Sequence, residues 1–183
     1  MMDKQKLIIA SASRIFEAEG FRGVGIDRVI APSGVSTRTL YKHFGSRDGL
    51  VIAVLKARHQ AFMKQLAAEY HDEDPLGSVF DSLQRWISEH GARGCMLLRA
   101  RSEYATANKE IVSLVHLQKS EFRAEIARRV RRVLGHDNEV LSSQIWLLFE
   151  GATASASVAS LSVIDDARSA ALCLLANATA RML

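Results

Sequence analysis

The feature that most constrains this chain is a pair of short helical segments separated by a helix-breaking turn. Residues 26–31 (Ile-Asp-Arg-Val-Ile-Ala) predict a first short helix, and residues 32–34 (Pro-Ser-Gly) end it. Ser36 can cap a second helix that extends to Phe44, because its hydroxyl can accept a hydrogen bond from a backbone N–H of the first turn. Two short helices joined by a glycine-containing turn are typical of a helix-turn-helix.

The second helix of this pair has distinct inner and outer faces. Val35 and Leu40 point inward in the predicted helix, and Phe44 closes the small core behind them. The outer face and its flanks keep the polar, basic and aromatic side chains: Thr37, Arg38, Thr39, Tyr41, Lys42 and His43. Such a face suits a DNA groove, although an ordinary surface helix of an all-α protein is the alternative.

The positive charge of the chain lies around this motif. Residues 1–60 contain 10 Lys and Arg against 5 Asp and Glu, a balance of +5. Residues 61–183 contain 14 against 15, a balance of −1, which leaves the net charge of +4. The excess therefore belongs to the segment with the predicted helix-turn-helix, as a module that faces phosphate requires.

The segment from Ile8 to Leu55 resembles the DNA-binding domain of the TetR family of transcriptional regulators. The matching residues keep the family's order and spacing: Ile15-Phe16, Gly20-Phe21, Ile26 through Ile30, Gly34-Val35-Ser36, Thr39-Leu40-Tyr41, His43-Phe44, Ser46-Arg47-Asp48 and Leu50. Three positions depart from the pattern, namely Gly25 in place of Ser or Thr, Pro32 in the turn, and Arg38 in place of a small residue. Arg38 bears on which DNA sequence is read rather than on whether DNA is bound.

Composition and periodicity predict an all-α chain. There are only two prolines, and long stretches are rich in Ala, Leu, Arg and Glu. Apolar residues at helical spacing predict about nine helices. Predicted helix starts after the motif are Ser46, Asp74-Pro75, Asn108, Asp137 or Asn138, and Asp165. The resemblance implies two domains: a helix-turn-helix DNA-binding domain over residues 1–50 and a helical effector-binding and dimerisation domain over residues 51–183.

The second helix of the motif has two predicted roles on DNA. Its N-terminal end lies nearest the base edges, where Arg38 can form two hydrogen bonds with one guanine. Its C-terminal side chains are predicted to hold phosphates, which positions the helix without reading sequence. The resemblance adds a phosphate contact from Arg47. The predicted DNA-binding residues are Ser36, Thr37, Arg38, Thr39, Tyr41, Lys42, His43 and Arg47.

One such module grips too few phosphates for tight binding, so we expect a homodimer on palindromic double-stranded DNA. Half-sites in successive grooves on one face lie about 34–36 Å apart. The resemblance implies that the last two helices of each chain pair into an intermolecular four-helix bundle, and packing within one chain is the alternative. The predicted interface residues are Gly151, Ala152, Ser155, Ala156, Ala159, Leu174, Leu175 and Ala178.

The resemblance also implies that the remaining helices enclose a pocket for a small-molecule effector, whose identity the sequence does not give. The candidate lining residues are Phe62, Trp86, Met96, Tyr104, His116, Phe122, Trp146, Phe149 and Glu150. Most aromatic residues at helical spacing are plain core, which is the alternative for each of them. Glu150 stands out, because a carboxylate that follows Trp-Leu-Leu-Phe needs a ligand, a partner or solvent.

Two other functions remain open, a helical-bundle enzyme and a DNA-binding protein without an effector. The sequence contains no Glu-x-x-His, His-Glu-x-x-His or Gly-x-Ser-x-Gly motif, which argues against the enzyme. We expect no cofactor and no metal, because the six His are scattered and Cys95 and Cys173 lack zinc spacing. Both cysteines are interpreted as reduced core residues.

The start of the chain lacks an apolar signal region. Residues 140–164 are the one stretch long enough to suggest a membrane span, but they contain Gln144, Glu150 and six serines. We therefore expect a cytoplasmic protein without a membrane partner. Near the end of another predicted helix, four arginines favour a solvated helix end over a second nucleic-acid patch, because arginine faces the negative end of the helix dipole there. These arginines are Arg128, Arg129, Arg131 and Arg132.

Overall fold

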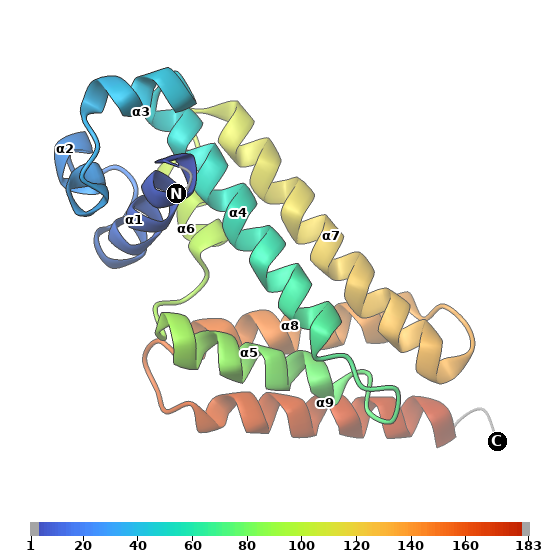
Figure 1. Cartoon of the computed structure of the whole chain (residues 1–183). Helices are drawn as coiled ribbons and strands as arrows, with labels where there is room; N and C mark the ends of the chain where they lie inside the picture. The colour runs from blue at the N-terminus through green and yellow to red at the C-terminus, as the bar shows by residue number, and fades with distance from the viewer. Residues whose placement is uncertain (1–3, 181–183) are drawn as a thin grey trace. The chain divides into compact units, whose positions relative to one another are not determined.

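The computed structural model describes residues 4–180, and every regular element in that range is helical (Figure 1). The predicted all-α class is confirmed, with nine α-helices and one 3-10 helix in the described residues. The elements are α1 (Lys4–Glu19), α2 (Ile26–Ile30), η1 (Ala31–Ser33), α3 (Thr37–Phe44), α4 (Arg47–Ala68), α5 (Gly77–His90), α6 (Met96–Glu103), α7 (Lys109–Leu134), α8 (Glu139–Ser155) and α9 (Ser162–Ala180).

Three predicted helix caps are confirmed by hydrogen bonds. The Ser36 Oγ accepts from the Thr39 backbone N–H over 3.3 Å at the start of α3. Asn108 Oδ1 accepts from the first turn of α7, and Asn138 Oδ1 accepts from the Leu141 N–H over 3.0 Å at the start of α8. Caps depend on residues close in sequence, which is why the sequence predicts them well.

Two helix starts differ from the prediction. The Asp74 carboxylate does accept from a backbone N–H, that of Gly77 over 2.8 Å, but residues 75–76 form a turn and α5 begins only at Gly77. The last helix begins at Ser162, before the predicted Asp165. Burial explains this early start, because Ile164 in its first turn is 1% exposed and packs into the core.

The described residues form two compact units. The first consists of residues up to 61 together with residues 96–118, and the second consists of residues 62–95 and those from 119 onward. Helices α4 and α7 each contribute residues to both units. Compactness does not test which residues suffice to bind DNA, so the predicted functional division at residue 50 stays a prediction.

The core of the first unit joins the helix-turn-helix to α1, α6 and the first halves of α4 and α7. Phe16 and Phe21 are fully buried with ring centroids 5.1 Å apart, and Tyr104 meets Phe21 edge-on at 6.3 Å. Burial raises the pKa of the Tyr104 hydroxyl above its ordinary value. Leu40 of α3 and Leu50 of α4 are fully buried in the same cluster. The helix-turn-helix is therefore anchored by a core that extends beyond residue 50.

The second unit is a helical bundle with an aromatic centre. Helix α9 lies beside α8 and α5 (Figure 1). The rings of Phe122 and Phe149 lie 4.5 Å apart, and Phe62 is within 6.0 Å of both. Trp86 meets Phe62 at 5.2 Å, which completes a cluster contributed by α4, α5, α7 and α8.

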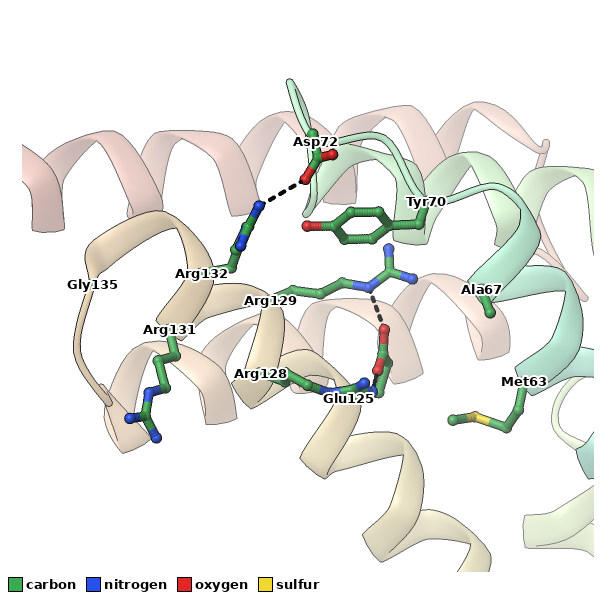
Figure 2. Close-up of a pocket in the computed structure, with 10 residues that line it drawn as sticks. All are labelled: Met63, Ala67, Tyr70, Asp72, Glu125, Arg128, Arg129, Arg131, Arg132 and Gly135. Atoms are coloured by element: carbon green, nitrogen blue, oxygen red, sulfur yellow. Dashed lines mark hydrogen bonds and ion pairs between the residues drawn. The ribbon is translucent and has the colours of Figure 1, made fainter.

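Arg129 corrects the prediction that four arginines lie on a solvated helix end. Its side chain is 2% exposed and its Nε bonds the Glu125 carboxylate over 2.6 Å (Figure 2). Its Nη2 donates to the Leu66 carbonyl of α4, and its Nη1 donates to the Pro75 carbonyl before α5 and to the Ser78 hydroxyl in the first turn of α5. Burial lowers the pKa of Arg129 to about 10, so it stays charged at neutral pH. This arginine is a structural tie, whereas the other three are exposed.

Gly49 in the first turn of α4 is required by a close approach to α3. A Cβ atom at this position would lie far inside van der Waals contact with the backbone oxygen of Phe44. We predict that Gly49→Ala lowers the free energy of unfolding by about 1–3 kcal/mol, because a backbone atom must move to make room. Urea unfolding followed by circular dichroism measures the change.

Gly23→Ala is the matched control for that substitution. Its Cβ would meet only the Glu19 oxygen at an ordinary 3.7 Å, so its unfolding free energy is expected to stay within about 0.5 kcal/mol of the native value. Equal stability of the two variants would show that the approach between Gly49 and Phe44 imposes no strain.

Candidate nucleic-acid interface

Helix α3 presents an exposed basic and aromatic face. Arg38, Tyr41, Lys42 and His43 are exposed, while Leu40 on the opposite side is fully buried. Helix α3 contains no acidic residue. Among residues 4–180, no hydrogen bond or ion pair engages the side chains of Arg38 and Lys42. Both cations are thus available to an external partner.

The turn before α3 is fixed by local hydrogen bonds. Gly34 adopts a left-handed backbone conformation (φ 66°) that residues other than glycine rarely take. This conformation lets the chain reverse direction after η1. The Ser33 hydroxyl donates to the Ile30 carbonyl over 2.6 Å, and the Thr37 hydroxyl donates to the Asp27 carboxylate over 2.8 Å. Thr37 therefore ties α3 to α2, which is a structural use of a residue predicted to face DNA.

The joint between α3 and α4 is equally constrained. Gly45 (φ 73°) ends α3, and its N–H donates to the Tyr41 carbonyl over 2.9 Å. Ser46 then caps α4, because its Oγ accepts from the Gly49 N–H over 2.9 Å. At the other end of α3, the Thr39 hydroxyl lies 3.0 Å from the Ser36 hydroxyl. Polar contacts therefore hold both ends of α3. The exposed face keeps a defined orientation.

Arg47 has partners that the sequence did not suggest. Its guanidinium donates to the backbone oxygens of Phe21 and Val24, the latter over 2.6 Å, and lies over the Phe16 ring. These contacts fix the segment between α1 and α2. They favour a structural role for Arg47, and its phosphate contact stays a prediction.

Two more residues that position the interface were missed in the sequence. The buried Ser11 hydroxyl of α1 donates to the Val29 carbonyl of α2 over 2.8 Å. The Glu103 carboxylate of α6 accepts from the backbone N–H groups of Phe21 and Arg22, over 2.9 and 2.8 Å. Phe21 and Glu103 are 82 residues apart, so no local pattern could have revealed the contact.

The charges beside α2 are partly neutralised. Arg28 and Glu19 form an exposed ion pair with a 2.7 Å separation. The hydrogen bond from Arg28 lowers the pKa of the Glu19 carboxyl, and the same bond raises the pKa of Arg28. The opposite charges of this pair offset each other, so the pair adds little positive potential to the α3 face. The uncompensated charge lies on Arg38 and Lys42.

The nine predicted effector-pocket residues fall into two groups. Met96 and Tyr104 are buried in the core of the first unit, and His116 is exposed there. In the second unit, Trp86 and three phenylalanines form the aromatic cluster. Trp146 lies under the Arg123 guanidinium at 4.8 Å. The roles of all nine residues in binding stay predictions.

Glu150 has one partner and one open oxygen. Its Oε1 lies 2.5 Å from the Lys119 Nζ, and both side chains are about 85% buried. Its Oε2 and the Trp146 Nε1 are buried in the second unit without a hydrogen-bond partner among the described residues. Unpaired buried polar atoms are costly, which makes these two atoms candidates for ligand contacts.

The predicted interface residues of α8 and α9 are divided between surface and core. Gly151, Ser155 and Ala159 are exposed, whereas Leu174, Leu175 and Ala178 are half-buried against the core. Ala152 and Ala156 are 4% and 3% exposed, because they pack inside the chain's own core.

Cys173 of α9 is exposed and Cys95 half-buried, which corrects the interpretation of both as core residues.

The helix-turn-helix and the helices around it match known proteins. Residues 8–54 match the family described as bacterial regulatory proteins, tetR family. A TetR-family transcriptional regulator from Streptomyces coelicolor has the same fold over 96% of both chains, with a TM-score of 0.88 and 25% identity. Residues 8–54 therefore match the TetR family, and the described chain has the fold of a TetR-family transcriptional regulator.

Two curated relatives are named as regulators of transcription. The chain is 28% identical over 127 residues to the HTH-type transcriptional repressor BdcR of Escherichia coli. These aligned residues cover 66% of this chain and 64% of that repressor. It is 32% identical over 76 residues to the HTH-type transcriptional regulator RutR of E. coli, which covers 42% of this chain and 36% of RutR. These relatives are transcriptional regulators, not enzymes.

No helix among the described residues combines the length and apolarity needed to cross a bilayer. Within residues 4–180, no group of three or more His, Cys, Asp or Glu is placed to hold a metal ion.

Arg38 and Lys42 are predicted to contribute differently to DNA binding. Arg38→Ala is expected to relax the preference at particular base pairs, with a loss of about 1–3 kcal/mol on the preferred sequence. Lys42→Ala is expected to weaken binding to all sequences and to reduce the salt slope by about one. Fluorescence anisotropy on a set of single-base-pair operator variants, at several salt concentrations, measures both. Uniform weakening by Arg38→Ala would refute its base-reading role.

Proposed function

We propose that this protein is a sequence-specific DNA-binding repressor that is released from a palindromic operator by a small-molecule effector. The observation that carries the proposal is the α3 face, where Arg38 and Lys42 are exposed, uncompensated and mounted on a helix fixed at both ends. The helix backbone that carries these cations is already ordered, so DNA binding does not have to order it. The name of BdcR as a repressor supports the direction of regulation.

Sequence reading and phosphate gripping are assigned to different parts of the face. Arg38 at the first turn of α3 reads a base edge, and Tyr41, Lys42 and His43 contact phosphate. Ser36 and Thr39 hold each other and the first turn, so their role is to present Arg38. A protein that binds an operator works where the DNA is, so we also propose a cytoplasmic location.

Dimerisation through α8 and α9 supplies a second helix-turn-helix, which binds the second half-site of the operator. A groove between these helices is lined by Leu147, Leu148, Gly151, Ser155, Ala170 and Leu174. Leu147 is 57% exposed, and the small residues beside it let a second helix approach closely. Ala152 also lines this groove, although it is only 4% exposed, whereas Ala156 packs inside the core.

The effector is proposed to bind in the second unit, against the aromatic cluster of Phe62, Trp86, Phe122 and Phe149. The open Glu150 Oε2 would accept a hydrogen bond from it, and the Trp146 Nε1 would donate one. An effector that prefers the DNA-incompetent form shifts the population towards that form and releases DNA. A DNA-binding protein without an effector remains the second candidate, and no ligand-dependent release would support it.

Binding to the DNA upstream of the protein's own gene is the first test. We predict nanomolar binding to this fragment at about 0.15 M salt and only about 10⁻⁴–10⁻⁶ M binding to a scrambled fragment of equal length, because non-specific binding depends on phosphate contacts alone. Fluorescence anisotropy with labelled fragments measures both. The same complex then serves to screen for compounds that release the DNA.

Equally weak binding to both fragments would leave two explanations, a distant operator or a wrong function. Selection from a random DNA pool separates them, because a sequence-specific regulator enriches a palindrome and a non-specific protein enriches nothing. Turnover of any screened compound would instead favour the alternative that the protein is a helical-bundle enzyme.

The dimer is tested by placing a charge in the groove. We predict that the native 20.2 kDa chain sediments with twice its mass and that Leu147→Glu shifts it towards the monomer, because a buried carboxylate at a helix interface lacks a partner. Val140→Glu is the control, since Val140 is 69% exposed on the same helix but does not line the groove. A native monomer, or equal effects of both variants, would contradict this interface.

A further inference from the structure

A second pocket lies in the second unit, between the last turns of α4 and the last turns of α7 (Figure 2). Its volume is about 870 Å³, within the range that small-molecule sites occupy. None of the residues of the aromatic cluster lines it. The pocket therefore shares no lining residue with the proposed effector site or with the α3 face.

One wall of this pocket is basic. Helix α7 contributes Arg128, Arg131 and Arg132, at positions three and four apart that share one face of the helix. Their side chains are 72%, 64% and 67% exposed. Arg129 lies behind them and donates four hydrogen bonds to protein acceptors, and these contacts fix this part of α7.

The existing partners of the three exposed arginines leave them free to bind a stronger anion. Arg131 and Asp137 are 3.5 Å apart, and Arg132 and Asp72 are 3.2 Å apart. Exposed pairs of this kind stabilise a protein very little. Arg128 contacts Glu125, which is already bonded to Arg129. Four arginines against Glu125 and Asp72 leave the lining with an excess of two positive charges.

The opposite wall is apolar and aromatic. Met63 and Ala67 lie one turn apart near the end of α4, and Tyr70 follows two residues after its last residue. The Tyr70 ring lies 5.1 Å from the Arg129 guanidinium, which holds the ring beside the arginines (Figure 2). The pocket therefore offers charged donors on one side and a flat apolar surface on the other.

We propose that this pocket binds an organic phosphate of the nucleotide type. Arg128, Arg131 and Arg132 bind the phosphate groups, because the planar fork of arginine matches phosphate oxygens with two hydrogen bonds. Met63, Ala67 and Tyr70 pack against the organic part. The protein thus has a site for a metabolic phosphate that is separate from its DNA-binding face.

Calorimetric titration of the full chain with three probes at about 0.15 M salt tests the site. Inorganic pyrophosphate tests the arginines alone, adenosine tests the apolar wall alone, and adenosine diphosphate tests both together. Native protein is expected to bind pyrophosphate, to bind adenosine diphosphate more tightly, and to show no measurable heat with adenosine.

The double variant Arg131→Gln/Arg132→Gln is expected to weaken both phosphate probes by about tenfold for each lost arginine–phosphate pair. Its fold is retained, because both side chains are exposed and make only exposed ion pairs. Arg85→Gln is the matched control, since Arg85 is an exposed arginine of the same unit that pairs with Glu69 outside the pocket. It is expected to leave both affinities unchanged.

Four results would contradict the proposal or a part of it. Absence of binding by both phosphate probes at millimolar concentration removes the site, and equal weakening in the Arg85→Gln control reduces it to a general charge effect. If the double variant keeps its pyrophosphate affinity but loses affinity for duplex DNA, the arginines contact nucleic acid instead. Should adenosine diphosphate bind no more tightly than pyrophosphate, the role assigned to the α4 wall is wrong.

Discussion

The DNA-facing helices depend on the way the segment between α1 and α2 is held. This segment has no regular helix of its own, so its backbone groups need partners from elsewhere. Glu103 accepts from the N–H groups of Phe21 and Arg22, while Arg47 donates to the oxygens of Phe21 and Val24. An unsatisfied buried backbone group costs about 1–3 kcal/mol. Two charged side chains, one from α6 and one from α4, thus satisfy a segment that could not satisfy itself.

This arrangement explains why the recognition helix can present free cations. Most polar groups around α3 are already paired: Thr37 with Asp27, Ser36 with Thr39, and Ser46 with Gly49. Arg38 and Lys42 are left out of this network and lie on the exposed face. A rigid support with unpaired charges on its surface favours binding, because the backbone that carries those charges does not have to be ordered when DNA binds.

The sequence predicts those parts of the fold that depend on neighbours along the chain. The caps at Ser36, Asn108 and Asn138 and the turn at Gly34 are local, and the structure confirms them. The role of Arg47 is not local, since its acceptors lie 23 and 26 residues away. A surface arginine and an arginine that ties two segments together look alike in sequence. The candidate DNA face was therefore predictable as a helix, while the residues that orient it were not.

Arginines near the end of α7 illustrate the same limit from the opposite side. All four fit the negative end of a helix dipole, and this explanation predicts that all are solvated. The structure separates them by register: Arg129 points to α4 and is buried, while Arg128, Arg131 and Arg132 surround it at the surface. A buried guanidinium needs acceptors for nearly all its donors, and Arg129 finds them on Glu125, Leu66, Pro75 and Ser78. The exposed three find only exposed or shared carboxylates, so their charge stays available to a ligand. The position of each arginine around the helix decides its role. The arginine that faces α4 stabilises the fold, and its exposed neighbours are available to the proposed ligand.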